Sequence, residues 1–189
     1  PVINALPDRF HPCQLLADAQ TFIELRGSLR GRRVAWIGDG NNMCHSYINA
    51  ARQLGFQLHI AAPPGYEPDP ALLDAAGECV ELSHDPLRAC TDADLITTDV
   101  WASMGQEEEQ ARRMAAFADY QVDERLLAVA RDDVLFMHCL PAHRGEEVAA
   151  EVLPFDMGYE WSNMSYQEKK ASGAGSVIFI FSLIFVFLI

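Results

Sequence analysis

The chain has 189 residues, half of them hydrophobic, which is enough to build one sizeable core but not comfortably two. Its formal net charge of −13 argues against nucleic acid as a partner, because no basic patch offsets the acidity. The cysteines number five and form no CxxC pair. Such cysteine usage leads us to expect a reducing, cytoplasmic setting.

Hydrophobic periodicity and turn residues predict alternating helices and strands up to residue 152. We expect strands at 33–37, 56–62, 79–82, 94–98 and 134–137. We expect helices at 14–26, 43–54, 70–76, from Asp85-Pro86 onward, 107–117, 123–130 and 145–152. Strands separated in this way by helices predict an α/β fold, a doubly wound parallel sheet of about five strands with flanking helices, Rossmann-like in class.

The pattern stops after Pro154, where we expect an irregular C-terminal tail. The predicted organisation is therefore an α/β domain at 1–152 and a tail at 153–189, made of a loop and an apolar segment. Residues 171–189 carry no charge, and as a helix they would reach roughly 28 Å, close to the bilayer core of about 30 Å. Length alone would permit a membrane anchor, but we favour a foreign or misread terminus.

The first predicted strand ends in a glycine-rich loop, Gly38-Asp39-Gly40-Asn41-Asn42, that precedes a helix. This arrangement raises the question of a dinucleotide site. Met43 occupies the third glycine position, and Ala61-Ala62-Pro63 stands where an acidic residue would bind a ribose. We therefore expect no organic cofactor. The loop presents two amides above the sheet, although the asparagines could also serve only as helix caps.

Two further strands end in polar side chains. The fourth is followed by Asp99, a carboxylate suited to a substrate ammonium, and then by a loop with Ser103 and Met104 that could close over a ligand. The fifth ends in His138-Cys139-Leu140-Pro141, where the proline blocks further strand pairing. Ligands of open α/β folds bind at the carboxyl ends of the strands, so we expect these ends to form one site.

A fourth motif, His11-Pro12-Cys13-Gln14, precedes the first predicted helix. Pro12 restricts His11 to an extended conformation, and both His11 and Gln14 could donate to a carbonyl oxygen near the helix start. Zinc is a separate alternative, because His138, Cys139 and His143 lie close together. The paired spacings of tetrahedral zinc sites are absent, so we expect no metal.

Together these motifs resemble a known family. FHPCQLLAD, WIGDGNN, TDVWASMGQEEE and FMHCLPAHRGEEV, in this order, are similar to ornithine carbamoyltransferase, within the aspartate/ornithine carbamoyltransferase family, over about residues 1–152. The resemblance implies transfer of a carbamoyl group from carbamoyl phosphate to the side-chain amine of ornithine, giving citrulline for arginine biosynthesis. It also implies no metal or organic cofactor, and a homotrimer.

The resemblance assigns roles to individual residues. His11 and Gln14 match positions that contact the carbamoyl group, and Cys139 and Leu140 match positions around the reacting amine. The family positions that hold the amino-acid end of ornithine correspond to Asn42, Asp99, Ser103 and Met104. His138 is counted with the substrate-binding residues, whereas Cys139 and His11 are the expected catalytic pair. His11 would stabilise the growing oxyanion, and Cys139 would orient the amine or accept its proton.

The sequence also departs from the family. It contains neither an STRT-type phosphate-binding loop nor an AENR-like arginine segment. Phosphate carries two negative charges and needs such donors, so we expect weak ornithine binding and no turnover by this chain alone. Two alternatives remain open: a carbamoyltransferase for a related amine acceptor, and a non-catalytic amino-acid-binding or interaction fragment.

Overall fold

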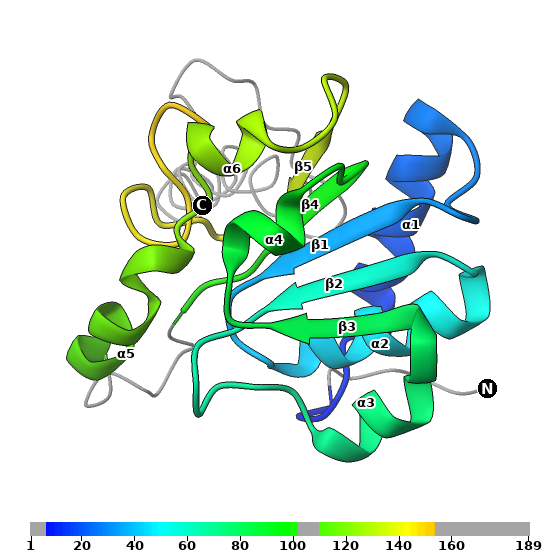
Figure 1. The fold of residues 1–189 in the computed structure, drawn as a ribbon, viewed down its shortest axis with the longest axis horizontal. Helices are drawn as coiled ribbons and strands as arrows, with labels where there is room; N and C mark the ends of the chain where they lie inside the picture. The colour runs from blue at the N-terminus through cyan, green and yellow to red at the C-terminus, as the bar shows by residue number, and fades with distance from the viewer. Residues whose placement is uncertain (1–6, 102–109, 154–189) are drawn as a thin grey trace, which may run out of the picture. The chain divides into compact units, whose positions relative to one another are not determined.

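The structure of this chain is a computed structural model, and it describes residues 7–101 and 110–153. Helices and strands alternate along these residues (Figure 1). The strands are β1 (Arg33–Ile37), β2 (Gln57–Ala61), β3 (Val80–Ser83), β4 (Leu95–Thr98) and β5 (Leu135–His138). The α-helices are α1 (Pro12–Arg26), α2 (Asn42–Leu54), α3 (Pro70–Ala76), α4 (Pro86–Cys90), α5 (Gln110–Phe117) and α6 (Glu124–Ala128). Short 3-10 turns span Gly77–Cys79 and Ala118–Tyr120.

The five strands form one parallel sheet in the order β3-β2-β1-β4-β5. The chain runs outward from β1 to β3, then returns to place β4 on the other side of β1 (Figure 1). This order confirms the predicted doubly wound α/β fold. The order reverses between β1 and β4, and ligands of open α/β sheets usually bind at the carboxyl ends of strands at such a switch point.

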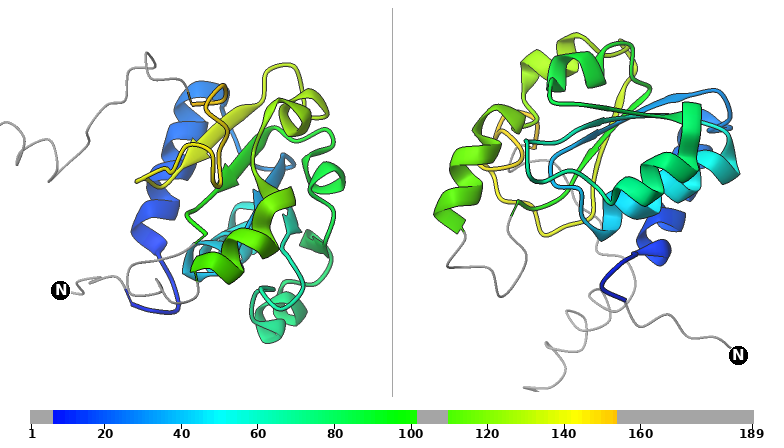
Figure 2. Two further views of the ribbon diagram at one scale, coloured as in Figure 1. Left: turned by 90° about the vertical axis from the view of Figure 1, so that its left-hand side faces the viewer. Right: turned by 60° about the horizontal axis from the view of Figure 1, so that its bottom comes forward.

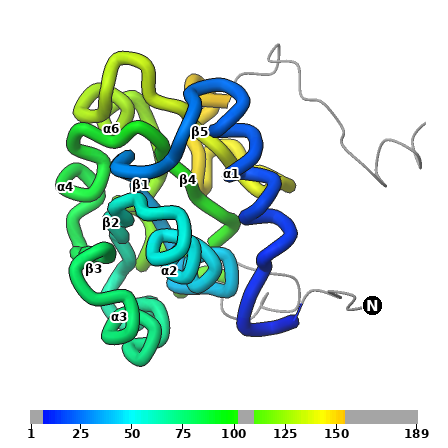
Figure 3. Tube along the Cα trace, turned by 90° about the vertical axis from the view of Figure 1, so that its right-hand side faces the viewer, coloured from blue at the N-terminus to red at the C-terminus, as the bar shows by residue number. Residues whose placement is uncertain are grey.

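Helices cover both faces of the sheet (Figures 2 and 3). One hydrophobic cluster joins α1 and α2 to the sheet, with Phe22, Trp36 and Ile48 fully buried. A second cluster lies on the opposite face, where α4, α5 and α6 pack through residues such as Phe117 and Leu126. The strands of a sheet covered on both faces are buried along their length, and β1 beyond Arg33 and all of β4 are buried in this way.

Short polar side chains fix where the helices begin. The side chain of Asn41 accepts hydrogen bonds from the backbone N–H groups of Met43 and Cys44 at the start of α2. Asp69, Asp85 and Asp123 cap α3, α4 and α6 in the same way. Each cap satisfies backbone donors that have no partner within the helix. The first of these caps also sets the position of the polar loop after β1.

The predicted helix at 145–152 is wrong. The described chain there forms turns and isolated bridges, with Val148 paired to Val122 and to Arg144. Two features oppose a helix: Gly145 has φ +88°, and the buried Glu147 carboxylate accepts the backbone N–H of His143. The Glu147 carbonyl oxygen accepts the Val122 N–H, and the Ala149 N–H donates to the Val122 carbonyl oxygen. These backbone groups are therefore not available for a helical ladder over 145–152.

Some predictions fall outside the described residues, namely the start of the 107–117 helix and nearly all of the 153–189 tail with its apolar segment. The boundary at 152/153 stays a prediction. Within 7–101 and 110–153, no helix has the length and apolar character needed to cross a bilayer.

Candidate functional site

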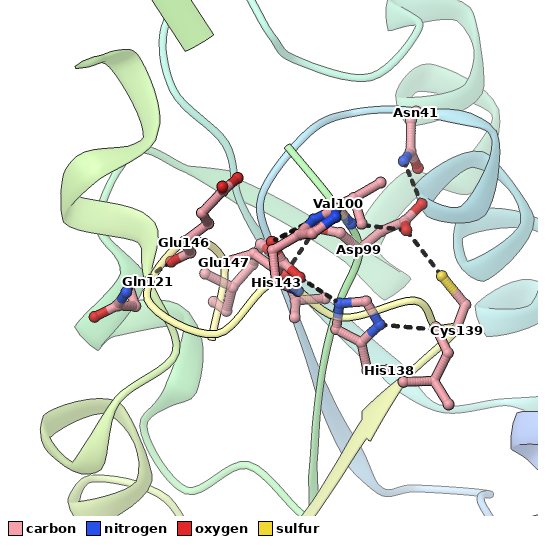
Figure 4. Close-up of polar contacts among 12 residues, drawn as sticks. Asn41, Asp99, Val100, Gln121, His138, Cys139, His143, Glu146 and Glu147 are labelled. Atoms are coloured by element: carbon pink, nitrogen blue, oxygen red, sulfur yellow. Dashed lines mark hydrogen bonds and ion pairs between the residues drawn. The ribbon is translucent and has the colours of Figure 1, made fainter. Parts of the chain in front are cut away.

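Asp99 lies at the end of β4 and joins two neighbouring strand ends (Figure 4). Its Oδ2 accepts a hydrogen bond from Asn41 Nδ2 at 2.7 Å, which links it to the loop after β1. Its Oδ1 accepts from the Cys139 thiol at 2.9 Å, which links it to the end of β5, and from the Val100 backbone N–H at 2.8 Å. The carboxyl ends of three strands therefore meet at this one carboxylate. We call Asn41, Asp99 and Cys139 the polar rim.

Cys139 is held as a neutral thiol. Burial raises its pKa well above the ordinary value, and the negative charge of Asp99 and its acceptance of the thiol hydrogen raise it further. A thiol with so high a pKa is a poor nucleophile and a poor base in neutral water. Its remaining chemistry is that of a hydrogen-bonding group beside a carboxylate, so it can orient a neighbouring amine.

His138 has one defined tautomer. Its Nδ1 accepts the backbone N–H of Leu140 at 2.8 Å, so the proton lies on Nε2, which donates to Glu147 Oε1 at 3.1 Å. Glu147 is fully buried. Burial acts to raise the pKa of Glu147, but the hydrogen bonds from His138 and from the His143 backbone outweigh it and lower that pKa. This buried pair fixes the turn that carries Cys139 (Figure 4).

His11 caps α1 and is held against α2. Its Nδ1 accepts the backbone N–H of Gln14 at 3.4 Å, which leaves Nε2 as the protonated ring nitrogen of the neutral imidazole. Its own backbone N–H donates to Ser46 Oγ at 2.7 Å. Ser46 in turn donates to the backbone oxygen of Asn42 at the start of α2. His11 can therefore present an N–H donor from a fixed position.

An ion pair fastens α5 to the loop after β1. Arg113 Nη1 donates to Asp39 Oδ2 at 2.7 Å and to the backbone oxygen of Trp101 at 2.8 Å. Both side chains are largely buried, with exposed fractions of 10% for Arg113 and 19% for Asp39. Burial raises the pKa of Asp39 in spite of Arg113, and the charge of Asp99 adds to this rise. Asp39 and Asp99 thus both lie at this edge of the sheet, and Arg113 offsets the charge of Asp39.

The predicted site residues have different outcomes. Asp99 and Cys139 lie in direct contact. His138 immediately precedes Cys139 in the turn after β5 and accepts the backbone N–H of Leu140. Asn42 begins α2, but its neighbour Asn41 makes the contact with Asp99. Leu140 is 53% exposed, with φ +51°. Ser103 and Met104 lie outside the described residues.

Sequence reasoning missed several polar residues of this region: Asp18, Asn41 as a partner of Asp99, Arg113 and Glu147. A signal existed for Asp18, since it shares the buried stripe of α1 with Leu15, Ala19 and Phe22. A carboxylate on such a stripe needs a partner. Glu147 gave no comparable signal, because a pair of glutamates after a glycine is typical of a solvated helix start.

Several side chains that can bind metal ions lie at and after the end of β5. The described residues do not gather His138, Cys139 and His143 into one ligand set, because Cys139 donates to Asp99 and His138 to Glu147. Within the described chain, His143, Glu146 and Glu147 place possible ligand atoms within 4.8 Å of one another. Both backbone and side-chain donors already engage Glu147 Oε1.

A separate hollow of about 420 Å³ lies between α6 and β5, lined by residues that include Leu127, Val134 and Phe136.

A polar rim at the switch point of a doubly wound sheet defines a small-molecule-binding α/β domain. The family model described as aspartate/ornithine carbamoyltransferase, Asp/Orn binding domain, matches residues 30–166, which is more than half of the chain. The chain therefore belongs to the aspartate/ornithine carbamoyltransferase family.

Curated relatives share this assignment. Proteins named ornithine carbamoyltransferase from Methylococcus capsulatus and Chromohalobacter salexigens are each 63% identical over 161 residues, or 85% of this chain. The same alignments span 54% and 53% of those proteins. The chain thus spans about half the length of the curated relatives that it matches.

Solved structures agree. The ornithine carbamoyltransferase of Burkholderia thailandensis is 51% identical, with a TM-score of 0.72 over 81% of this chain and 49% of that one. The enzyme from Pyrococcus furiosus is 48% identical, with a TM-score of 0.76 over 82% of this chain and 52% of that one.

Proposed function

We propose that this chain supplies the ornithine-binding part of an ornithine carbamoyltransferase. The reaction would move a carbamoyl group from carbamoyl phosphate to the side-chain amine of ornithine and give citrulline, as in arginine biosynthesis. One observation carries the proposal: Asp99 at the switch point, held by Asn41 and Cys139. The names of the relatives support the same activity.

The rim suits a cationic amino acid. An ionised carboxylate offers about four acceptor positions, and three donors already occupy positions on Asp99. One position is left for a ligand ammonium group. Asp39 adds little to this attraction, because its carboxylate is paired with Arg113 at 2.7 Å. In this proposal Asp99 and Asn42 hold the amino-acid end, together with Ser103 and Met104.

The chemistry would follow from positioning and from stabilisation of developing charge. A neutral amine attacks the carbamoyl carbon, and negative charge grows on the carbonyl oxygen. The Nε2–H of His11 would donate to that oxygen more strongly in the transition state than in the ground state. Cys139 and Leu140 would hold the amine beside the carbon. The high pKa of Cys139 favours an orienting role and speaks against a thioester.

We further propose that the isolated chain binds ornithine weakly and does not turn over. Carbamoyl phosphate carries two negative charges, whereas the edge described here is rich in carboxylates. The guanidinium group of Arg113 at this edge is engaged by Asp39 and by the backbone oxygen of Trp101. Donors for the phosphate and assembly into a homotrimer are expectations that rest on the family. The cytoplasmic setting is an expectation that rests on the cysteine usage.

A titration of the purified chain tests the binding part. Ornithine should bind better than putrescine, which has both amines but no carboxylate. Asp99→Asn should weaken ornithine about 10-fold or more, because a hydrogen bond to a charged group is lost. Asp133→Asn serves as the matched control, since Asp133 is exposed. Equal binding of both ligands would favour a different amine acceptor.

A radiometric citrulline assay tests the catalytic part. We expect no turnover by the chain alone. Turnover close to that of an intact enzyme would contradict this expectation. No binding of either ligand by calorimetry or NMR would instead favour the interaction-fragment alternative and overturn the proposal.

A further inference from the structure

Asp18 is a buried carboxylate in the middle of α1, with an exposed fraction of 8%. It accepts a hydrogen bond from Gln14 Nε2 at 2.9 Å and another from the Tyr47 hydroxyl at 2.8 Å. A buried charge is costly, and an apolar side chain at this position would pack against Phe22 and Leu15 at lower cost. The position therefore calls for a reason beyond packing.

The carboxylate determines which way the amide of Gln14 faces. An ionised carboxylate only accepts hydrogen bonds, so the NH2 group of Gln14 must point toward Asp18. The carbonyl oxygen, Oε1, then points the other way, and it accepts no hydrogen bond from the residues that the structure describes. Gln14 thus offers Oε1 as an acceptor to whatever lies beyond it, together with the second N–H of its amide group.

Asp18 also lies near the proposed site. Burial raises the pKa of Asp18, while Gln14, Tyr47, His11 and His138 each lower it. The pKa of Cys139 is raised mainly by burial and then by Asp99. The charge of Asp18 raises it further, with a weaker effect. Asp18 is hydrogen-bonded to Gln14 at the start of α1 and to Tyr47 of α2. Gln14 is one helical turn away from Asp18, on the side of His11.

We propose that Asp18 is a positioning residue that makes Gln14 selective for the NH2 group of a carbamoyl moiety. This inference rests on the proposed function, because it assumes that the carbamoyl group lies beside Gln14. The fixed Oε1 would accept from a carbamoyl NH2. An acetyl methyl group has nearly the same size but cannot donate, so it would leave Oε1 without a partner.

The rival explanation is that Asp18 merely ties α1 to α2 through Tyr47. The two explanations differ in what Asp18→Asn does. Gln14 donates to Oδ1 of Asp18, and Tyr47 donates to Oδ2. The amide of Asp18→Asn keeps one of these oxygens and replaces the other with an NH2 group, so it cannot accept at both positions. If Tyr47 keeps the acceptor, Gln14 must turn its Oε1 inward and its NH2 outward. The preference for a carbamoyl group over an acetyl group would then fall. If Asp18 only connected α1 to α2 through Tyr47, the substitution would leave this preference unchanged.

The test compares two ligands of equal shape, citrulline and Nδ-acetylornithine, by NMR titration of the full chain. The unsubstituted chain should bind citrulline about 3- to 10-fold more tightly, the effect of one hydrogen bond. In Asp18→Asn this ratio should fall to about one or invert. Glu24→Gln is the matched control, because Gln20 Nε2 donates to Glu24 in the same helix at an exposed position. It should keep the ratio of the unsubstituted chain.

A second measurement does not require a variant that folds. The Nε2 protons of Gln14 should exchange with water more slowly than those of Gln20, because the Gln14–Asp18 bond is part-buried and the Gln20–Glu24 bond is exposed. Equal exchange rates, or an unchanged ligand ratio in folded Asp18→Asn, would overturn this inference alone. If the unsubstituted chain bound neither ornithine nor citrulline, the proposed function would fail, and this inference with it.

Discussion

Asp99 holds three donors from three parts of the chain: Asn41, Cys139 and the backbone of Val100. A carboxylate in this position fixes the side chains around it and still keeps acceptor capacity. The effect on Cys139 is the opposite of activation, since burial and Asp99 together keep its thiol protonated. This combination of a rigid anion and an inert thiol suits the orientation of an amine.

Thiol alkylation measures the state of Cys139 directly. We expect Cys139 to react slowly with iodoacetamide over about pH 7 to 10, while the exposed Cys13 reacts readily. Asp99→Asn should raise the rate at Cys139 only in part, because burial is the larger cause of its high pKa. Mass spectrometry of tryptic peptides gives both rates in one sample. Reaction of Cys139 as fast as Cys13 would contradict this account.

Glu147 should contribute to stability in a pH-dependent way. Its pKa in the folded chain lies below its ordinary value of 4.5, so the ionised form is favoured by folding. Its contribution is therefore present above about pH 4.5 and is lost as the pH falls through the lower, folded-state pKa. Glu147→Gln should cost about 2 kcal/mol at neutral pH, because hydrogen bonds to a buried charge are weakened.

Urea denaturation at several pH values tests this prediction. The gap between the unsubstituted chain and Glu147→Gln should narrow as the solution becomes acidic. Glu146→Gln is the neighbouring control, since Glu146 is only partly buried, and it should change stability by less than about 0.5 kcal/mol. A gap that does not depend on pH would show that the charge of Glu147 is not what stabilises the turn.

Single-residue roles were only partly predictable. Asp99 and Cys139 could be found because each follows a buried strand, and parallel strands end at one edge. Asn42 and Asn41 could not be told apart, because the choice depends on which residue caps α2. The structure shows that Asn41 does both tasks: its oxygen caps α2, and its amide nitrogen reaches Asp99. A sequence pattern cannot resolve a difference of one residue in a loop.

The loop between β1 and α2 passes very close to the backbone of residues 66–68. A side-chain carbon at Gly40 would collide with the backbone of Glu67 and Pro68. The Gly40 N–H also donates to the backbone oxygen of Tyr66 at 2.8 Å. The glycine therefore serves close packing of two loops, which in turn holds Asn41 at the rim. The sequence raised the question of a dinucleotide site at this loop and argued against it, and the close approach to Gly40 is from the protein's own backbone.

Gly40→Ala should destabilise the chain by roughly 1–3 kcal/mol or more, because backbone atoms cannot easily move away. Gly65→Ala provides a contrast. Gly65 has φ +87° but open space around it, so only backbone strain of about 1 kcal/mol is expected there. Thermal unfolding of both variants gives the comparison. A Gly40→Ala variant more stable than Gly65→Ala would contradict the close packing described.

Elements with strong local signals were predicted closely. β1 and α3 match the predicted 33–37 and 70–76, since a buried apolar run and a proline at a capped helix start leave little choice. The segment after Gly145 was predicted wrongly, because its structure depends on a long-range partner. Val122 pairs with Val148, and Glu147 binds His138 from inside the fold. Neither contact leaves a periodic trace in the sequence.

At the scale of the whole molecule, the strand order concentrates chemistry at one edge. Reversal of the order between β1 and β4 brings Asn41 and Asp99 together, and β5 adds Cys139 beside them. The resulting edge is acidic, in keeping with a net charge of −13. The family model is described as an Asp/Orn binding domain, and the proposal of ornithine adds to it the carboxylate of Asp99 at this edge.

The central claim is that ornithine binds at the polar rim. A ¹⁵N–¹H NMR titration of the chain with ornithine tests it most directly, because each backbone amide reports its own surroundings. We predict the largest shifts in residues 38–42, 99–100 and 138–140, and their loss in Asp99→Asn. Shifts confined to the hollow between α6 and β5, around Leu127 and Phe136, or no shifts at all, would contradict the claim.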